Sequence, residues 1–121
     1  MEKQVVYTGH TSNVVDGRVA VNFYGRLILT HTNKTAGYPN DTKYHIWHLY
    51  EVESETGEKK YRVYDEFHTL DNGMSDHYKL TKEMTLKETA KKYPEIINEA
   101  IDHGLFQVDD VTEEASNIDY E

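Results

Sequence analysis

Cysteine is absent from the 121 residues of this chain. The absence excludes a disulfide framework, a thiolate nucleophile and a zinc site built from thiolates. Long apolar runs are missing too: the longest span only a few residues, whereas a helix needs about 20 to cross a bilayer. The first residues also lack the apolar stretch of a secretory signal. We therefore expect a soluble, cytoplasmic protein that has no membrane partner.

Positive charge is missing from the C-terminal quarter of the chain. Residues 1–94 carry 13 Lys and Arg against 13 Asp and Glu, whereas residues 95–121 carry nine acids and no Lys or Arg. The net charge of −9 thus belongs to the last quarter. Such an acidic end is a solvated surface that repels polyanions, or it imitates nucleic-acid phosphates toward a protein partner. The sequence is compatible with both interpretations.

Glycine and proline are scarce, with seven and two residues, so the turn signals can be read one by one. Asp16-Gly17 lies between two alternating segments, and Asp-Gly is a strong signal for a two-residue hairpin turn. That turn makes the numbers of opposed residues add up to 33, with Val6 opposite Leu27. Gly25 predicts a bulge or bend that helps the sheet to curl toward a barrel. The predicted core face of this hairpin consists of Val6, Val14, Val19, Val21, Phe23 and Leu27.

A second hairpin is predicted from two apolar segments, 44–54 and 59–69, which flank Gly57. A two- or four-residue loop makes opposed numbers add up to 113, whereas a three-residue loop with a left-handed Gly57 makes them add up to 112 and exchanges the faces. We favour 113 because it places Glu51 opposite Arg62 and gathers the apolar residues on the other face. That face would hold Ile46, Tyr50, Val52, Tyr61, Val63 and Phe67.

A turn at 71–73 and a strand near 77–83 extend this hairpin into an antiparallel meander. A chain of this length forms one domain. We predict an α+β fold in which a strongly bent antiparallel sheet, or small open barrel, is followed by two short C-terminal helices. Residues 1–108 would form the domain, with 105–108 as a candidate closing strand, and 109–121 an acidic tail.

The two helices are predicted from an apolar stripe at helical spacing. A capping-box pattern begins at Thr85 and marks the first N-terminus. Pro94 divides the stripe, because its ring clashes with the preceding turn while it suits the first position of a new helix. We expect helices at about 85–92 and 94–103, the second ending at Gly104.

A histidine beside a carboxylate is the candidate catalytic pair. The 113 register places His48 opposite Asp65, an arrangement that suits a general base or a buried structural pair. No Ser or Lys nucleophile is identifiable nearby, which favours the structural interpretation. His45 lies on the opposite face from His48, and a pair of His45 and His68 would lack a third metal ligand. We predict no enzyme activity, no metal and no cofactor.

Residues 59–67, KKYRVYDEF, combine three cations with three aromatic residues. In the 113 register, Lys60 and Arg62 face acids in an exposed ladder worth about a few tenths of a kcal/mol per pair. This pairing favours an ordinary strand, because a phosphate-binding surface needs cations that have no partner. The candidate nucleic-acid-binding residues are Tyr24, Arg26, Lys60, Arg62, Tyr64 and Lys79.

Five segments carry a family resemblance: YTGHTSN (7–13), GRVAVNFYGRLI (17–28), LYEV (49–52), YKLT (78–81) and TLKETAKKYPEIINEAI (85–101). In these segments the chain resembles a small family from Gram-positive conjugative elements, the PrgU-type regulators of pheromone-inducible plasmids. The resemblance implies a PUA-like fold, which is a compact curled β-sheet with helices. It also implies a cytoplasmic regulator that limits expression of conjugation or surface-adhesin genes through RNA.

Three functions are open at this point. The first is a non-enzymatic regulatory protein that binds RNA, and the second is an inhibitor or adaptor that binds a protein through the helices and the acidic tail. The third is a small enzyme that uses His48 and Asp65. A continuous positive groove joining Arg26, Arg62 and Lys79 would favour RNA, whereas scattered and paired charges would favour a protein partner.

Overall fold

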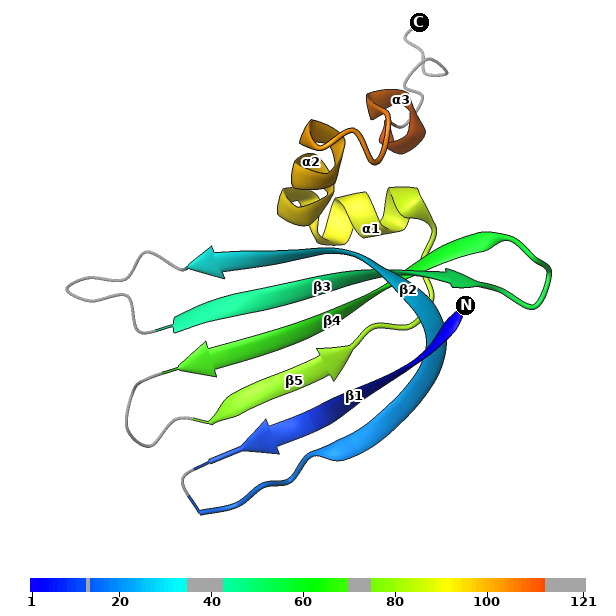
Figure 1. Cartoon of the computed structure of the whole chain (residues 1–121). Helices are drawn as coiled ribbons and strands as arrows, with labels where there is room; N and C mark the ends of the chain where they lie inside the picture. Colours follow the sequence, from blue (N-terminus) through cyan, green and yellow to red (C-terminus); the bar gives the residue numbers. More distant parts are fainter. Residues whose placement is uncertain (13, 35–42, 70–74, 113–121) are drawn as a thin grey trace, which may run out of the picture.

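The computed structural model describes residues 1–12, 14–34, 43–69 and 75–112, and Figure 1 shows their arrangement. The strands close into a barrel in chain order, because β1 pairs with both β2 and β5. This confirms the α+β class and a small barrel, which is closed where an open one was predicted. The described elements are β1 (Glu2–Thr11), β2 (Val19–Lys34), β3 (Lys43–Glu53), β4 (Lys59–Thr69), β5 (Asp76–Leu80), α1 (Leu86–Lys92), α2 (Pro94–Asp102) and α3 (Val108–Val111).

Strand β2 is long and strongly curved (Figure 1), so its first half pairs with β1 and its second half with β3. Gly25 lies where the partner changes. A Cβ atom at this position would lie 3.0 Å from both the Glu51 carbonyl oxygen and a methyl group of Val52. A bulge follows between Leu27 and Leu29. The bend predicted at Gly25 is therefore present, and the close approach of β3 leaves little room for a side chain there.

The predicted register of the first hairpin is wrong. Val6 lies opposite Val21, so the opposed numbers add up to 27 rather than 33. Asp16-Gly17 does not form the turn, because Asp16 already pairs with Thr11 and the Gly17 N–H donates to the carbonyl oxygen of His10 at 2.9 Å. The positive φ angle lies at Gly9 instead. Because the register shifts by an even number, six, each residue stays on the face of the sheet that was predicted for it. Of the predicted core face, Val6 and Phe23 are buried, Val21 is half-buried, and Val14, Val19 and Leu27 are exposed.

Strands β3 and β4 pair in the 112 register, with Leu49 opposite Val63, and not in the favoured 113 register. The connecting turn explains the difference. Gly57 adopts a φ of 82°, and its N–H donates to the carbonyl oxygen of Ser54 at 2.9 Å. The N–H of Ser54 in turn donates to the carbonyl oxygen of Glu58. A left-handed glycine at this place produces the three-residue loop.

Both faces of β3 and β4 are covered, which explains why charge pairing was a poor guide to the register. Tyr61 is buried as predicted, but on the face that carries Glu51. Glu51 is only 6% exposed and lies 3.2 Å from the guanidinium of Arg26. Arg62 points to the other face, opposite Tyr50. The predicted ladder of exposed charges is therefore not formed.

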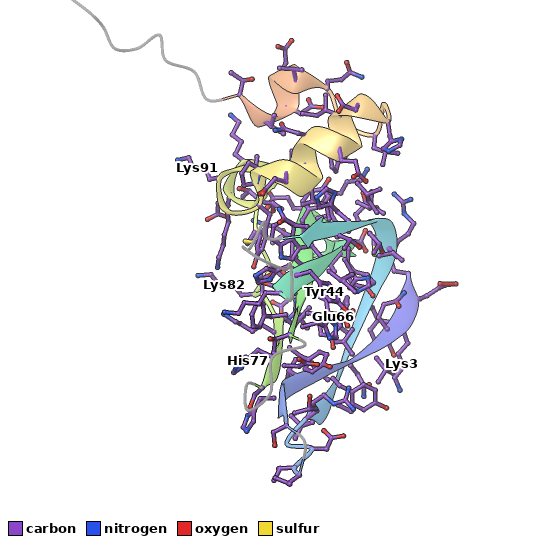
Figure 2. The ribbon with its side chains drawn as sticks, turned by 90° about the vertical axis from the view of Figure 1, so that its left-hand side faces the viewer. Lys3, Tyr44, Glu66, His77, Lys82 and Lys91 are labelled. Atoms are coloured by element: carbon purple, nitrogen blue, oxygen red, sulfur yellow. The ribbon has the colours of Figure 1, made fainter. Side chains whose placement is uncertain are left out.

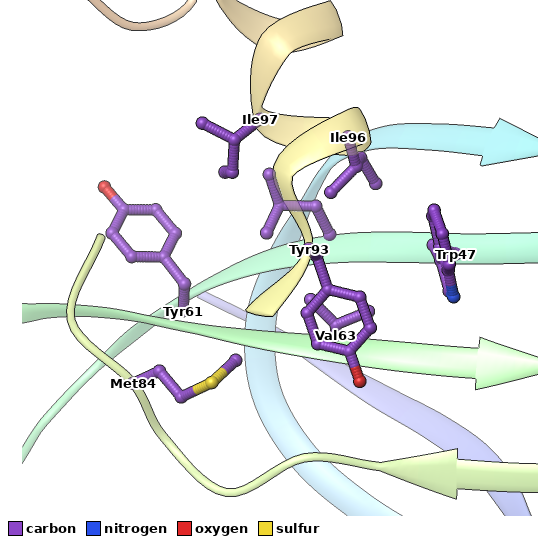
Figure 3. Close-up of a cluster of buried hydrophobic side chains, with 8 residues drawn as sticks. Trp47, Tyr61, Val63, Met84, Tyr93, Ile96 and Ile97 are labelled. Atoms are coloured by element: carbon purple, nitrogen blue, oxygen red, sulfur yellow. The ribbon is translucent and has the colours of Figure 1, made fainter. Parts of the chain in front are cut away.

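Two hydrophobic clusters lie on the two sides of these strands. The cluster inside the barrel consists of Val6, Phe23, Tyr50, Val52, Tyr64 and Tyr78. The cluster between the sheet and helices α1 and α2 consists of Trp47, Leu49, Tyr61, Val63, Met84, Tyr93, Ile96 and Ile97 (Figure 3). Strands β3 and β4 thus form a middle layer, with apolar contacts both above and below them.

The two predicted helices are confirmed to within two residues, as α1 and α2. The Thr85 side chain accepts from the N–H of Glu88 at 3.1 Å, and the Glu88 carboxylate accepts from the N–H of Thr85 at 2.8 Å. Pro94 is the first residue of α2. Gly104, with a φ of 76°, ends that helix as predicted. In the described residues, no helix is long and apolar enough to cross a bilayer.

The chain beyond α2 differs from the prediction. Residues 105–108 do not form a closing strand, and α3 begins at Val108, where the domain was expected to end. Val111 packs against the cluster between the helices and the sheet. The first residues of the predicted acidic tail are therefore helical. Residues 113–121 and the predicted turn at 71–73 lie outside the described residues.

Candidate functional site

The six residues predicted to bind nucleic acid are distributed over different surfaces. Tyr24 is exposed on the hairpin of β1 and β2, and Lys79 is exposed on β5. The Arg26 guanidinium is paired with Glu51 on the side of the helices. The Lys60 ammonium lies 3.8 Å from the Glu58 carboxylate. Two of the six thus have acidic partners already.

The other two predicted residues, Arg62 and Tyr64, point into the barrel. Arg62 donates to the carbonyl oxygen of Thr81 at 2.9 Å and lies over the Phe23 ring, and its burial lowers its pKa. The Tyr64 hydroxyl donates to the carbonyl oxygen of Tyr7 at 2.6 Å, and burial raises its pKa to about 12. Both side chains are therefore engaged in the core, and the predicted cations do not converge into one groove.

The predicted pairing of His48 with Asp65 is wrong, because the two side chains lie on opposite faces of the sheet. Asp65 instead lies 2.7 Å from Nδ1 of His45 on the outer face. His48 contacts Glu66 on the inner face. His45 and His68 are also on opposite faces, since His68 lies opposite the neighbour of His45. The 112 register accounts for all of these differences.

A chain of hydrogen-bonded side chains lines the inner face. Thr30 Oγ1 lies 3.1 Å from Nδ1 of His48, whose Nε2 contacts Glu66. The other carboxylate oxygen of Glu66 lies 3.0 Å from Nε2 of His68. Nδ1 of His68 lies 3.2 Å from Asp76. Figure 2 shows Glu66 between the layers of the barrel.

This inner chain is a network of charged and polar side chains joined by hydrogen bonds inside the barrel. Its hydrogen bonds to His48 and, more weakly, to His68 lower the pKa of Glu66 against the opposing effect of burial. Both nitrogens of each imidazole have a hydrogen-bond partner within the network. Tyr64 stacks on His48 and Tyr44 stacks on His68, at 5.6 and 5.2 Å between ring centroids.

A pocket of about 390 Å³ lies on the outer face of β3, β4 and β5. The strand register assembles it. His45 lies opposite Phe67, and Phe67 lies opposite His77, while Asp65 lies opposite Lys79 in the adjacent row. These five residues line the pocket. Three consecutive strands therefore place two imidazoles, a carboxylate and an ammonium group around one apolar ring.

The aromatic rings of this face form a continuous row. The ring centroids of His45 and Phe67 are 5.0 Å apart, and those of Phe67 and His77 are 6.2 Å apart. His10 of β1 extends the row at 6.2 Å from His77. Figure 2 shows His77 on the outside of the sheet. Such a row is a platform on which planar groups can stack.

Some polar groups of the pocket already have a hydrogen-bond partner, and others do not. The hydrogen bond between Nδ1 of His45 and Asp65 orients the imidazole and leaves Nε2 for a ligand. The charge of Asp65 also adds to burial in raising the pKa of Tyr93 to about 12. His77 and Lys79 are exposed and have no hydrogen-bond or ion-pair partner in the described part of the chain. The pocket can therefore offer the Lys79 ammonium group and an imidazole nitrogen of His77 to a ligand.

Two residues of this pocket had been singled out from the sequence, Lys79 as a nucleic-acid contact and Asp65 as the partner of His48. His45 was considered for a metal site, and Phe67 was assigned to the core. The signal that would have found the pocket is Gly57: a left-handed glycine selects the 112 register, which places His45 opposite Phe67. The alternation of His77 and Lys79 then adds β5 to the same face.

Comparison of the chain with protein-family models, with curated proteins and with solved structures found no match. The resemblance to PrgU-type regulators therefore stays a prediction.

Proposed function

We propose that this protein binds single-stranded RNA at the outer-face pocket of β3, β4 and β5 and regulates gene expression through that binding. The observation that carries the proposal is the row of His45, Phe67 and His77 beside Lys79. The Lys79 side chain forms no ion pair among the described residues, although Asp65 lies opposite it on β4. Unpaired bases stack on aromatic rings with little dependence on sequence, and an ammonium group pairs with the phosphate backbone.

The dimensions of the pocket suit one nucleotide. Its volume of about 390 Å³ is at the small end of ligand sites. The row continues to His10 on β1, so a second base can stack beyond the pocket. Because residues 1–94 carry equal numbers of cations and acids, long-range attraction is weak. Binding then depends on the few groups at this surface.

The regulatory part of the proposal comes from the family resemblance. A PrgU-type protein would have a PUA-like fold and would limit expression of conjugation or surface-adhesin genes. The closed barrel with helices on one side agrees with the compact curled sheet that the resemblance implies (Figure 1). A more specific assignment to the PUA-like fold and to these genes is part of the proposal.

Lys79→Gln and Phe67→Leu are expected to weaken RNA binding. Loss of the ammonium group should lower affinity several-fold and reduce the slope of log affinity against log salt by about 0.7, the value for one phosphate contact with a single strand. Loss of the aromatic ring should cost about tenfold, since stacking of one base is worth about 1–3 kcal/mol. Fluorescence anisotropy of a labelled single-stranded RNA at two salt concentrations measures both effects.

Lys3→Gln is the matched control, because Lys3 is exposed on the side of the molecule away from His77 (Figure 2). It removes the same charge from a different surface. Equal losses in Lys3→Gln and Lys79→Gln would mean that only net charge matters. Absence of measurable RNA affinity in the unaltered protein would reject the proposal.

A protein-binding inhibitor or adaptor is the second candidate. It is favoured by the separation of Arg26, Arg62 and Lys79 onto different surfaces and by the exposed acids Asp109 and Asp110 of α3. Deletion of residues 113–121 separates the two functions while it leaves α3 in place. An RNA-binding protein should keep or gain RNA affinity in anisotropy, because negative charge is removed. An adaptor should instead lose its protein partner on this deletion and show no measurable RNA affinity either before or after it.

A further inference from the structure

We propose that the outer-face pocket also cleaves the RNA that it binds, with His77 as general base and His45 as general acid. The reaction is the transfer of the phosphoryl group of a phosphodiester from the 5′-oxygen of one nucleotide to the 2′-oxygen of the preceding nucleotide. The inference rests on the proposed function, because it takes bound single-stranded RNA as its substrate. It goes beyond that function by assigning an activity to the same side chains.

The two imidazoles lie on either side of the Phe67 ring. His45 is on β3 and His77 is on β5, with Phe67 of β4 between them. Two strand spacings separate their backbones by about 10 Å. A phosphodiester above the Phe67 ring would lie between the two imidazoles. Each imidazole could reach it through one hydrogen bond of about 2.8 Å. General acid and base catalysis in one step needs such an arrangement, with one group at each end of the reacting bonds.

His45 is suited to the role of acid. Its Nδ1 hydrogen-bonds to Asp65 at 2.7 Å, so a proton on Nδ1 is directed at the carboxylate. In the imidazolium form the second proton is on Nε2, the nitrogen that the structure leaves for a ligand. Asp65 thus positions the ring and balances its positive charge, while His45 itself donates to the substrate.

The chemistry of the lining decides the nucleophile. Among the residues that the structure describes, the five that line the pocket include no hydroxyl or thiol group that could attack phosphorus. The substrate must therefore bring its own nucleophile, and RNA does so in the 2′-hydroxyl adjacent to every phosphodiester. DNA can occupy the same surface, but it lacks this hydroxyl. The pocket is therefore expected to distinguish the two nucleic acids by reaction rather than by binding.

The step balances without a further reactant. Neutral His77 accepts the proton of the 2′-hydroxyl as the 2′-oxygen forms its bond to phosphorus. The bond between phosphorus and the 5′-oxygen breaks, and the His45 imidazolium gives its Nε2 proton to that oxygen. The products are a 2′,3′-cyclic phosphate and a free 5′-hydroxyl. Lys79 faces the same space, and its ammonium group stabilises the negative charge that grows on the phosphoryl oxygens.

The experiment uses the full chain and a DNA oligonucleotide that contains one ribonucleotide between a fluorophore and a quencher. The unaltered protein should cleave it at that nucleotide, and mass spectrometry should find the cyclic phosphate. His45→Gln and His77→Gln should each lower the rate at least about 100-fold. Asp65→Asn should lower kcat more than it changes KM. An all-deoxy oligonucleotide should stay intact.

His103→Gln is the matched control, because His103 is an exposed histidine at the end of α2, away from the pocket. It should cleave like the unaltered protein. Circular dichroism melting of each variant verifies folding, and Lys79→Gln provides a slow variant at an exposed residue. Equal cleavage by all variants would identify a contaminating ribonuclease and overturn the inference, as would the absence of cleavage.

A parallel binding measurement separates this inference from the proposed function. A 2′-O-methyl RNA of the same sequence cannot react but can still stack and pair with cations. Binding of this RNA without cleavage of the ribonucleotide substrate would overturn the catalytic inference alone. If the unaltered protein neither bound the 2′-O-methyl RNA nor cleaved the ribonucleotide substrate, the proposed function would be overturned as well.

Discussion

Leu49→Ala is expected to lower the free energy of unfolding by about 2–5 kcal/mol. Leu49 is fully buried between β3 and the helices, in contact with the cluster that includes Ile96 and Val63. Truncation to Ala removes buried methyl groups and leaves a cavity that a sheet packed on both faces cannot close. Urea denaturation followed by circular dichroism measures the loss, and the melting temperature should fall by about 10 °C or more.

Leu27→Ala is the matched control, because Leu27 undergoes the same chemical change on the neighbouring strand β2 but is 47% exposed. Its effect should stay below about 1 kcal/mol. The comparison also tests the register. In the 113 alignment Leu49 would lie on the wet face beside Glu51, and the two variants would then be similarly stable.

Glu66→Gln is expected to lower the free energy of unfolding by about 1–2 kcal/mol at pH 7. The Glu66 carboxylate joins His48 and His68 within the barrel, and an amide cannot accept from both imidazoles as a charged group does. The side chain is 20% exposed, which moderates the loss. Urea denaturation of the variant and of the unaltered protein, in the same buffer, measures the difference.

The same pair of proteins should become equally stable in acid. The hydrogen bonds from His48 and His68 lower the pKa of Glu66 in the folded state below its ordinary value of 4.5. The contribution of this carboxylate is therefore complete above pH 4.5 and is lost as the pH falls through the folded-state pKa. Glu53→Gln, at an exposed position on β3, should show neither effect. A difference between Glu66→Gln and the unaltered protein that grows in acid would contradict the assignment.

The predictions that succeeded depend on short-range chemistry. The capping box at Thr85, the Pro94 start and the Gly104 end each involve neighbours within one turn of helix. The meander likewise follows from turns between consecutive strands. These features placed α1 and α2 to within two residues. The bend of β2 was predicted from Gly25 alone, although the close approach of β3 is what leaves little room for a side chain there.

The predictions that failed depend on partners that the local pattern does not specify. In a strand that has one face in water, only one set of alternate residues is apolar, and that set identifies the core face. Strands β3 and β4 are apolar on both faces, because the helices cover one face and the other lines the barrel. The prediction of the 113 register from charge pairing was therefore wrong, because Glu51 pairs with Arg26 on β2 and not with Arg62 on β4. The candidate pair of His48 and Asp65 failed with that register.

The sequence by itself determined the class of fold, the antiparallel meander and the ends of the two main helices, because these follow from contacts between near neighbours. The pairing of β1 with β5, which closes the barrel, was decided by the tertiary structure. Only the tertiary structure decided which imidazole lies beside which carboxylate. A shift of one residue reverses every side chain of a strand, and the energy that selects the alignment comes from the helices and the Gly57 turn together. The pocket of His45, Asp65, Phe67, His77 and Lys79 exists because of that selection.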